Sequence, residues 1–336
     1  MPLGKAILGL MVGIASVSLW AGFQQEVNAG VTKSVQETKV PAYDVLEVTG
    51  KPALTFSFAG HKGRVFALEG PTMSRDFVYA GNRIVFAQGA IFRHGSEYRP
   101  PQEGMEDEPW SELYRMPLEG NKVQLRKKIE DSDAGKDDIA VCGGYVLFQC
   151  VRDGMLALYD GQEVYQGVAP WKEEYHGMVG TPNGELLLVR QPDTICLAKL
   201  EGKVISEPQE ILAHARKVLE EPAAVLSPVF LDDKELFVSL SLGEKFPRML
   251  CSFDRKGELL TCYLGRNGKN TSWAVTEHYV LQAGRDEGLI IFDRATGKRL
   301  FAEKIKDFYP SYLYGLEGDK VLMSGGCAEY SLMELE

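Results

Sequence analysis

Five arginines occupy equivalent positions in a repeated apolar pattern of this 336-residue chain. Guanidinium groups that converge on one point grip a carboxylate, sulfate or phosphate with paired hydrogen bonds. The same arginines also have a purely local use, because several stand beside an acid in the sequence and such a pair stiffens a turn. Both interpretations stay open for Arg93, Arg152, Arg190, Arg248 and Arg285.

Aromatic and histidine side chains accompany these arginines. His94 follows Arg93 directly, and Tyr175 and His176 follow two glutamates in a stretch typical of exposed residues. Aromatic planes beside polar donors suit a sugar, a peptide or an aromatic ligand. We therefore predict that His94, Tyr175 and His176 line the mouth of the arginine site. Trp273, in an apolar run, is instead expected to wedge between packed sheets.

Signatures of catalysis are scarce in the sequence. The chain has five histidines, and it carries no Gly-x-Ser-x-Gly elbow, phosphate-binding loop or dinucleotide fingerprint. No spacing of cysteine and histidine is typical of zinc or haem. These observations favour binding over catalysis, and they predict neither a metal site nor a cofactor.

A short apolar sequence pattern recurs six times and indicates how the arginines are positioned. A period of about forty residues with several short strands per unit is typical of a β-propeller, whose blades pack only on their neighbours. The arginines then fall between the second and third strands of five blades, on the face where loops vary most freely. The second residues of the six copies of the pattern are Ile84, Val146, Leu186, Leu236, Val280 and Val321.

Two units show four strands most clearly. Residues 138–167 alternate apolar runs with the pairs Gly143-Gly144 and Asp160-Gly161, and residues 273–302 repeat this plan. Gly-Gly and Asp-Gly between apolar runs are strong hairpin signals. The predicted fold class is therefore all-β, with residues 30–336 as a single propeller domain.

The two ends of the chain decide the number of blades. The last unit, residues 312–335, has room for three strands. An amino-terminal strand, either 44–48 or 64–68, is expected to complete this blade and close the ring, which removes open sheet edges. This arrangement gives six blades, and the additional segment Leu54–Phe58 leaves seven blades as the alternative.

Two stretches interrupt the repeat. Residues 95–110 hold adjacent prolines and several acids, a composition that forbids a strand and predicts an exposed loop. Residues 207–221 predict one short amphipathic helix on the rim, because their apolar residues fall at helical spacing. Those apolar residues are Ile211, Leu212, Ala215, Val218 and Leu219.

The six cysteines all follow residue 29. An even number in an oxidising compartment permits disulfides, whereas cysteines inside apolar strands are typically buried free thiols. Cys251 and Cys262, which flank the turn 254–257, form the best candidate pair. A three-residue loop places them on opposite faces of the sheet, and a four-residue loop brings them together. The disulfide stays open at this point.

The segment around this turn carries a family resemblance. The sequence CSFDRKGELL at 251–260, followed by GRNG at 265–268, resembles the strand-turn-strand of six-bladed NHL or TolB-like propellers. The sequence IFDRATGK at 291–298 is similar to the corresponding piece of quinoprotein-type repeats. Each match covers one hairpin. The resemblance implies the superfold, which hosts binders, hydrolases, lyases and dehydrogenases, and it transfers no catalytic residue.

The amino end has the features of an export signal. Lys5 precedes a stretch without charge over residues 6–23, and Val27-Asn28-Ala29 offers small residues to a signal peptidase. We predict that residues 1–29 are a signal peptide. The alternative is an uncleaved anchor helix, which the glycines and serines of the stretch disfavour. The expected location is periplasmic or secreted, without membrane insertion after processing.

The net charge of the chain argues against some classes of partner. A formal net charge of −10 argues against nucleic acid or an anionic membrane as the main partner. We expect an exported monomer that binds an anionic small molecule, a glycan or a protein. Two alternatives stay open. One is a periplasmic enzyme that uses the propeller channel, as a quinone-cofactor dehydrogenase or a metal-assisted hydrolase or lyase; the other is a structural subunit of an envelope complex.

Overall fold

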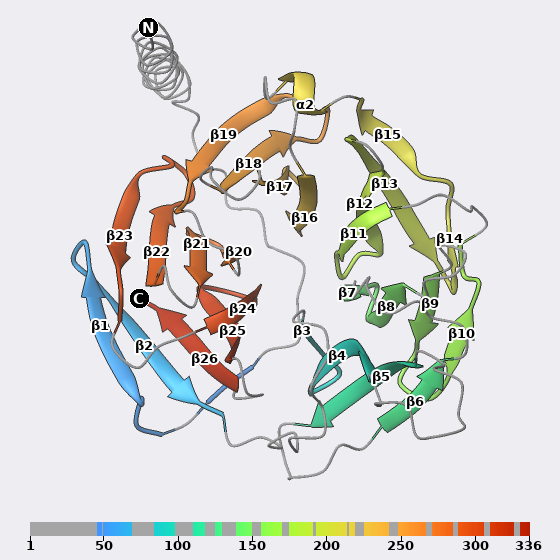
Figure 1. The fold of residues 1–336 in the computed structure, drawn as a ribbon, viewed down its shortest axis with the longest axis horizontal. Helices are drawn as coiled ribbons and strands as arrows, with labels where there is room; N and C mark the ends of the chain where they lie inside the picture. Colours follow the sequence, from blue (N-terminus) through green and yellow to red (C-terminus); the bar gives the residue numbers. More distant parts are fainter. Residues whose placement is uncertain are drawn as a thin grey trace, which may run out of the picture. The chain divides into compact units, whose positions relative to one another are not determined.

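In a computed structural model of the chain, the described strands form six antiparallel sheets placed around a ring (Figure 1). The predicted all-β, six-bladed propeller is confirmed. The sheets belong to the compact unit Val40–Glu336. The predicted signal peptide, residues 1–29, lies outside the described residues, which are 46–48, 50–68, 84–97, 110–117, 125–129, 139–149, 156–169, 175–190, 193–213, 215–218, 225–241, 248–266, 271–284, 288–305, 310–325 and 330–336.

Four of the sheets are blades of four consecutive strands, and we number the blades along the chain. Blade 1 holds β3 (Ile84–Ala87), β4 (Ala90–Glu97), β5 (Trp110–Pro117) and β6 (Leu125–Ile129). Blade 2 holds β7 (Ile139–Cys142), β8 (Tyr145–Gln149), β9 (Leu156–Tyr159) and β10 (Val164–Gln166). Blade 4 holds β16 (Val225–Leu231), β17 (Glu235–Ser241), β18 (Met249–Asp254) and β19 (Leu259–Leu264). Blade 5 holds β20 (Thr271–Val275), β21 (Tyr279–Gly284), β22 (Gly288–Asp293) and β23 (Arg299–Glu303).

Strands β4 and β5 extend further than the sequence predicts. Residues 95–110 were expected to form a loop throughout, yet β4 runs to Glu97 and β5 starts at Trp110. Gly95, Ser96 and Glu97 pair in register with Glu112, Ser111 and Trp110. The prolines therefore limit the strands less than expected, because both lie beyond the paired residues.

Blade 3 has a broken outer strand in place of the predicted rim helix. It contains β11 (Tyr175–Gly180), β12 (Glu185–Arg190), the long β13 (Thr194–Glu201), β14 (Val204–Ile205) and β15 (Gln209–Leu212). Strands β14 and β15 pair with opposite ends of β13. Among the described residues of the helix predicted over 207–221, those of α2 (Ala215–Val218) alone are helical. The edge of β13 offers unpaired backbone groups to Gln209–Leu212, and this pairing outweighs the helical spacing of the apolar residues.

Blade 6 closes the ring with amino-terminal strands. Its sheet has the order β1-β2-β26-β25-β24, which joins β1 (Leu54–Phe58) and β2 (His61–Ala67) to β24 (Pro310–Gly315), β25 (Lys320–Gly325) and β26 (Tyr330–Leu335). Of the two predicted closing segments, 64–68 is correct, because Ala67 to Gly63 pair with Ser331 to Leu335. Leu54–Phe58 is a fifth strand of this blade, so the alternative of seven blades is wrong.

The core lies between neighbouring sheets. The innermost strands β3, β7, β11, β16, β20 and β24 each contact the innermost strand of the next blade, and β24 contacts β3 in turn. Buried clusters join blades 2 and 3, 4 and 5, and 5 and 6. Trp273 belongs to the cluster between blades 4 and 5 and stacks on Phe292, so its predicted wedge position is confirmed.

The antiparallel order gives the ring two unlike faces. One face carries the turns between first and second strands and between third and fourth strands; we call it the turn face. The other carries the second-to-third connections and the links between blades; we call it the connection face. Most turns on the turn face are short, as at Gly143-Gly144, whereas the connection face includes segments as long as 98–109. Variable connections of this kind usually carry function in proteins built on a rigid scaffold.

Two blade boundaries are bridged on the turn face by arginine. Arg255, in the turn after β18, pairs with Glu185 of blade 3 and donates 3.0 Å to the carbonyl oxygen of Asp232 in its own blade. Arg294 holds the same place in blade 5. It pairs with Asp232 of blade 4 and donates 3.0 Å to the carbonyl oxygen of Thr276 in its own blade. We call these two the arginine joints.

Two other boundaries are bridged by close backbone approach. Gly180 ends β11, and a Cβ there would overlap the carbonyl oxygen of Val141 in blade 2. Gly315 ends β24, and a Cβ there would overlap the carbonyl oxygen of Val275 in blade 5. Only glycine lets these inner strands meet so closely. We call these two the glycine joints.

Candidate functional site

Arg190 lies on the connection face at the end of β12. Its Nη2 donates 2.9 Å to Oε2 of Glu210, which lies on the broken outer strand β15. The Arg190 side chain is 35% exposed and the Glu210 side chain 47%. An ion pair this exposed contributes little to stability, so the guanidinium is accessible to a competing anion at small energetic cost.

Arg248 lies on the same face, directly before β18 of the adjacent blade. Its Nη1 donates 3.4 Å to the carbonyl oxygen of Thr271, the first residue of β20 in blade 5. The side chain is half-buried. Arg248 therefore bridges blades 4 and 5 on the connection face, as Arg294 does on the turn face.

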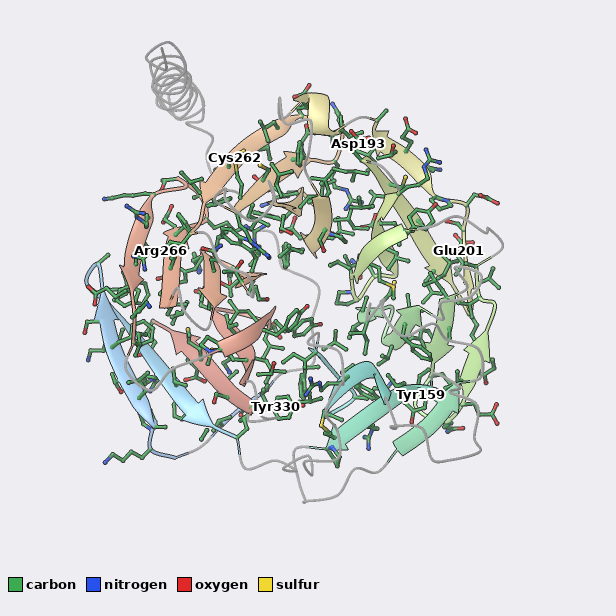
Figure 2. The ribbon with its side chains drawn as sticks, viewed as in Figure 1. Tyr159, Asp193, Glu201, Cys262, Arg266 and Tyr330 are labelled. Carbon is green, nitrogen blue, oxygen red and sulfur yellow. The ribbon has the colours of Figure 1, made fainter. Side chains whose placement is uncertain are left out.

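A third arginine of this face was not singled out from the sequence. Arg266 follows β19 and donates 2.8 Å through Nη2 to the carbonyl oxygen of Ala302 (Figure 2). The side-chain amide of Gln282 holds the backbone of Arg266: its Oε1 accepts from the amide nitrogen at 2.7 Å, and its Nε2 donates to the carbonyl oxygen at 3.2 Å. Gln282 is buried. The recurrence of arginine at second-to-third connections could not find Arg266, because Arg266 stands in a link between blades.

Arg93 is a buried residue of strand β4, not a residue of a connection. It is 8% exposed, and its Nη1 donates 3.5 Å to the hydroxyl of Tyr330 in blade 6 (Figure 2). That hydroxyl in turn contacts the sulfur of Met116. Burial raises the pKa of Tyr330, and the charge of Arg93 acts in the opposite direction. The predicted connection position is wrong because β4 continues past Arg93 to Glu97.

Tyr175 is buried rather than exposed as the sequence suggested. It starts β11, is 4% exposed and belongs to the core cluster between blades 2 and 3. The preceding glutamates made the stretch look exposed, yet the alternation within the strand turns Tyr175 inward. Arg93, predicted to be one of the site arginines, and Tyr175, predicted to line the mouth of the site, are therefore both buried.

The remaining predicted residues have less structural detail. His94 lies in β4 and His176 in β11, where the structure describes their backbone alone. Arg152 and Arg285 lie outside the described residues. Of the five predicted arginines, the described part of the chain thus places Arg190 and Arg248 on the connection face of neighbouring blades 3 and 4.

Two further features of the described residues bear on the site. No group of three or more histidine, cysteine, aspartate or glutamate side chains in them is placed to hold a metal ion. In the same residues, no helix has the length and apolar character needed to cross a membrane.

Comparison with known proteins gives fold-level similarity alone. No protein-family model matches the chain, and no curated protein matches its sequence. A Bacteroides thetaiotaomicron protein of unknown function superposes with a TM-score of 0.47 at 11% identity, over 82% of this chain and 76% of that one. The β-propeller domain of Cps50 (Swd1) from Myceliophteria thermophila superposes with a TM-score of 0.43 at 10% identity, over 75% of this chain and 96% of that one. The ring of blades itself supports a binding or scaffold role, since propellers present variable loops on a rigid frame.

Proposed function

We propose that this chain is an exported binding module that holds its ligand on the connection face. The observation that carries the proposal is that Arg190, Arg248 and Arg266 all lie on this one face, at strand ends of blades 3 and 4, in a chain with net charge −10. Planar guanidinium groups suit an anionic small molecule or an acidic glycan.

The turn face supports this choice by contrast. Two of its arginines serve the joints between blades: Arg255 pairs with Glu185, and Arg294 pairs with Asp232. A ligand there would compete with contacts that hold the ring together. On the connection face, Arg190 takes part in an exposed ion pair that an anion displaces more cheaply.

The amino-terminal sequence supports the part of the proposal that places the module outside the cytoplasm. The charge-free stretch at 6–23 and the small residues before Gly30 are the basis for this part of the proposal. The protein recovered from outside the cytoplasm should begin at Gly30. Material that still carries Met1 would instead favour an anchored form.

Binding is tested with inorganic phosphate, sulfate and a uronic-acid oligosaccharide, each titrated calorimetrically into the purified mature chain. We expect at least one of these probes to bind. Arg190→Ala or Arg248→Ala should weaken that binding about ten- to a hundredfold, the value of a lost charge-assisted hydrogen bond. Arg190→Lys should recover little of the lost affinity, because a lysine ammonium group does not make the paired, planar hydrogen bonds of a guanidinium group.

The matched control is Arg299→Ala. Arg299 is an exposed arginine at the start of β23, on the turn face, so its removal changes the net charge equally without touching the proposed site. The proposal fails if no probe binds, or if the Arg299 variant weakens binding as much as the other two.

A further inference from the structure

Two cysteine sulfurs meet on the outer half of blade 4. Cys262 lies on the outermost strand β19 (Figure 2) and Cys251 on the neighbouring strand β18. Their Sγ atoms are 2.7 Å apart. The sulfurs of a disulfide are about 2.05 Å apart, so a small side-chain movement separates this contact from a bond.

A β-bulge explains why the two residues stand opposite each other. The turn has three residues, since the amide nitrogen of Asp254 donates 2.9 Å to the carbonyl oxygen of Glu258. From this turn alone, the two cysteines would fall on opposite faces of the sheet. The register then shifts: Phe253 pairs with Leu259, whereas Ser252 pairs with Thr261. The one extra residue in β19 shifts the register by one position, so that Cys251 pairs with Cys262.

The position of the pair in the ladder also suits a disulfide. The amide nitrogen of Gly265 donates 2.9 Å to the carbonyl oxygen of Arg248, which marks a hydrogen-bonded pair. Hydrogen-bonded and non-hydrogen-bonded pairs alternate along antiparallel strands, so the Cys251–Cys262 pair, three steps further, is non-hydrogen-bonded. Cα atoms in such pairs are about 4.5 Å apart, within the range that disulfides span.

The two thiols differ in their access to solvent. Cys251 is fully buried, whereas Cys262 is half-buried on the outermost strand. Cys142 and Cys196, by comparison, lie inside the core cluster between blades 2 and 3. Among the described cysteines, Cys262 is therefore the one that an external oxidant reaches first.

We propose that Cys251 and Cys262 form a disulfide that locks β19 onto β18, and that Cys262 is the sulfur through which oxidation enters. The oxidant is a disulfide, either a small molecule such as oxidised glutathione or a protein disulfide. The Cys262 thiolate attacks one sulfur of the oxidant, which forms a mixed disulfide and releases one thiolate. The Cys251 thiol gives up its proton to that thiolate and attacks the Cys262 sulfur, which expels the second thiolate. Two protein thiols are oxidised and one external disulfide is reduced to two thiols.

The bond fixes an element that contributes to the next blade boundary. Tyr263 follows Cys262 on β19, and its hydroxyl donates 2.6 Å to the carbonyl oxygen of Arg294 in blade 5. The bond closes a short loop, because the two cysteines are eleven residues apart. Reduction should therefore lower the melting temperature by a few degrees, not unfold the protein.

The experiment equilibrates the full chain with glutathione buffers of increasing oxidised fraction, followed by alkylation in denaturant and tryptic peptide mapping. Cleavage after Arg255 and Lys256 places the two cysteines on separate peptides, 249–255 and 257–266, so the bond appears as a cross-linked pair. We expect this pair under oxidising conditions, and we expect the two peptides alkylated singly after reduction. Cys196→Ser is the control and should leave the cross-link intact.

Two single variants test the order of attack. Cys251→Ser leaves Cys262 without its partner and should accumulate a glutathione adduct at Cys262. Cys262→Ser should leave Cys251 at least about tenfold slower to react, because that thiol is buried. The proposal is overturned if both peptides stay singly alkylated at every glutathione ratio, if either cysteine is cross-linked to a third one, or if Cys251 reacts as fast as Cys262.

Discussion

The arginine joints and the glycine joints connect neighbouring blades in two different ways. Between blades 3 and 4 and between blades 4 and 5, Arg255 and Arg294 reach across to a carboxylate of the preceding blade. Between blades 2 and 3 and between blades 5 and 6, Gly180 and Gly315 let the inner strands approach until backbone meets backbone. A long charged side chain bridges the first two boundaries, and the absence of a side chain lets backbone meet backbone at the other two.

The glycine joints place backbone groups of successive turns within hydrogen-bonding reach. The amide nitrogen of Gly143 donates 2.9 Å to the carbonyl oxygen of Thr181, and that of Glu277 donates 3.4 Å to Gly318. The arginine joints replace such bonds by charge. They therefore depend on ionic strength and on the burial of the ions, whereas the glycine joints depend on shape.

The largest effect is expected from substitution at a glycine joint. Gly315→Ala should destabilise the protein by about 3 kcal/mol, because the new Cβ must displace the backbone carbonyl of Val275 rather than a flexible side chain. Urea unfolding measures the change. Gly318→Ala is the control: Gly318 has a φ of 67° and open space around it, so alanine there costs only about 1 kcal/mol of backbone strain. Equal costs at both positions would show that close approach is not what the joint requires.

Removal of an arginine joint is expected to have the next largest effect, and its size should follow burial. The Arg294 and Asp232 side chains are 11% and 12% exposed, and the guanidinium also lies over the ring of Phe237. Arg294→Ala should cost about 2 kcal/mol, because it removes the guanidinium partner of a largely buried carboxylate, which keeps its hydrogen bonds from the backbone of Lys234 and Glu235. Arg255 and Glu185 are 25% and 31% exposed, so Arg255→Ala should cost about 1 kcal/mol or less.

This pair of variants is compared by urea unfolding at low and high salt. Salt should reduce the cost of Arg255→Ala more than that of Arg294→Ala, since exposed ion pairs are screened more strongly. A larger cost for the Arg255 variant would contradict the assignment of the two joints to different depths.

The blades could be predicted from the sequence wherever a local turn fixes the strands. Gly143-Gly144 and Asp160-Gly161 set the strands of blade 2 without help from distant residues. The broken outer strand of blade 3 could not be predicted in the same way. Whether Gln209–Leu212 is helix or strand depends on the free edge of β13, which is a property of the folded blade.

The candidate site could be predicted less well than the fold. Arg190 and Arg248 were found because they follow the strand repeat, and both lie on the expected face. Arg93 also fits the repeat, but its environment is set by Tyr330, more than two hundred residues away. The opposed cysteines depend on a bulge of one residue, for which the local sequence gives no signal.

The smallest effect is expected from the ionisable pair at the glycine joint between blades 5 and 6. His278 Nδ1 lies 2.7 Å from Asp319 Oδ2, and the other carboxylate oxygen accepts from the backbone of His278 and from Thr276. The hydrogen bond with Asp319 raises the pKa of His278 above its ordinary value. The protonated form is therefore the one that the fold prefers. Its contribution is complete below the unfolded pKa of about 6.5 and is lost as pH rises through the higher folded value.

The His278 side chain is 66% exposed, so solvent screens the interaction and the change in stability should be small. It is measured as the difference in melting temperature between the protein and His278→Gln from pH 5 to pH 9. The difference should favour the unmodified protein at acid pH and shrink through neutrality, and salt should reduce it. A difference that grows with pH would reverse the assigned direction of the pKa shift. A difference as large as that caused by Gly315→Ala would mean that charge, rather than close backbone approach, holds this joint.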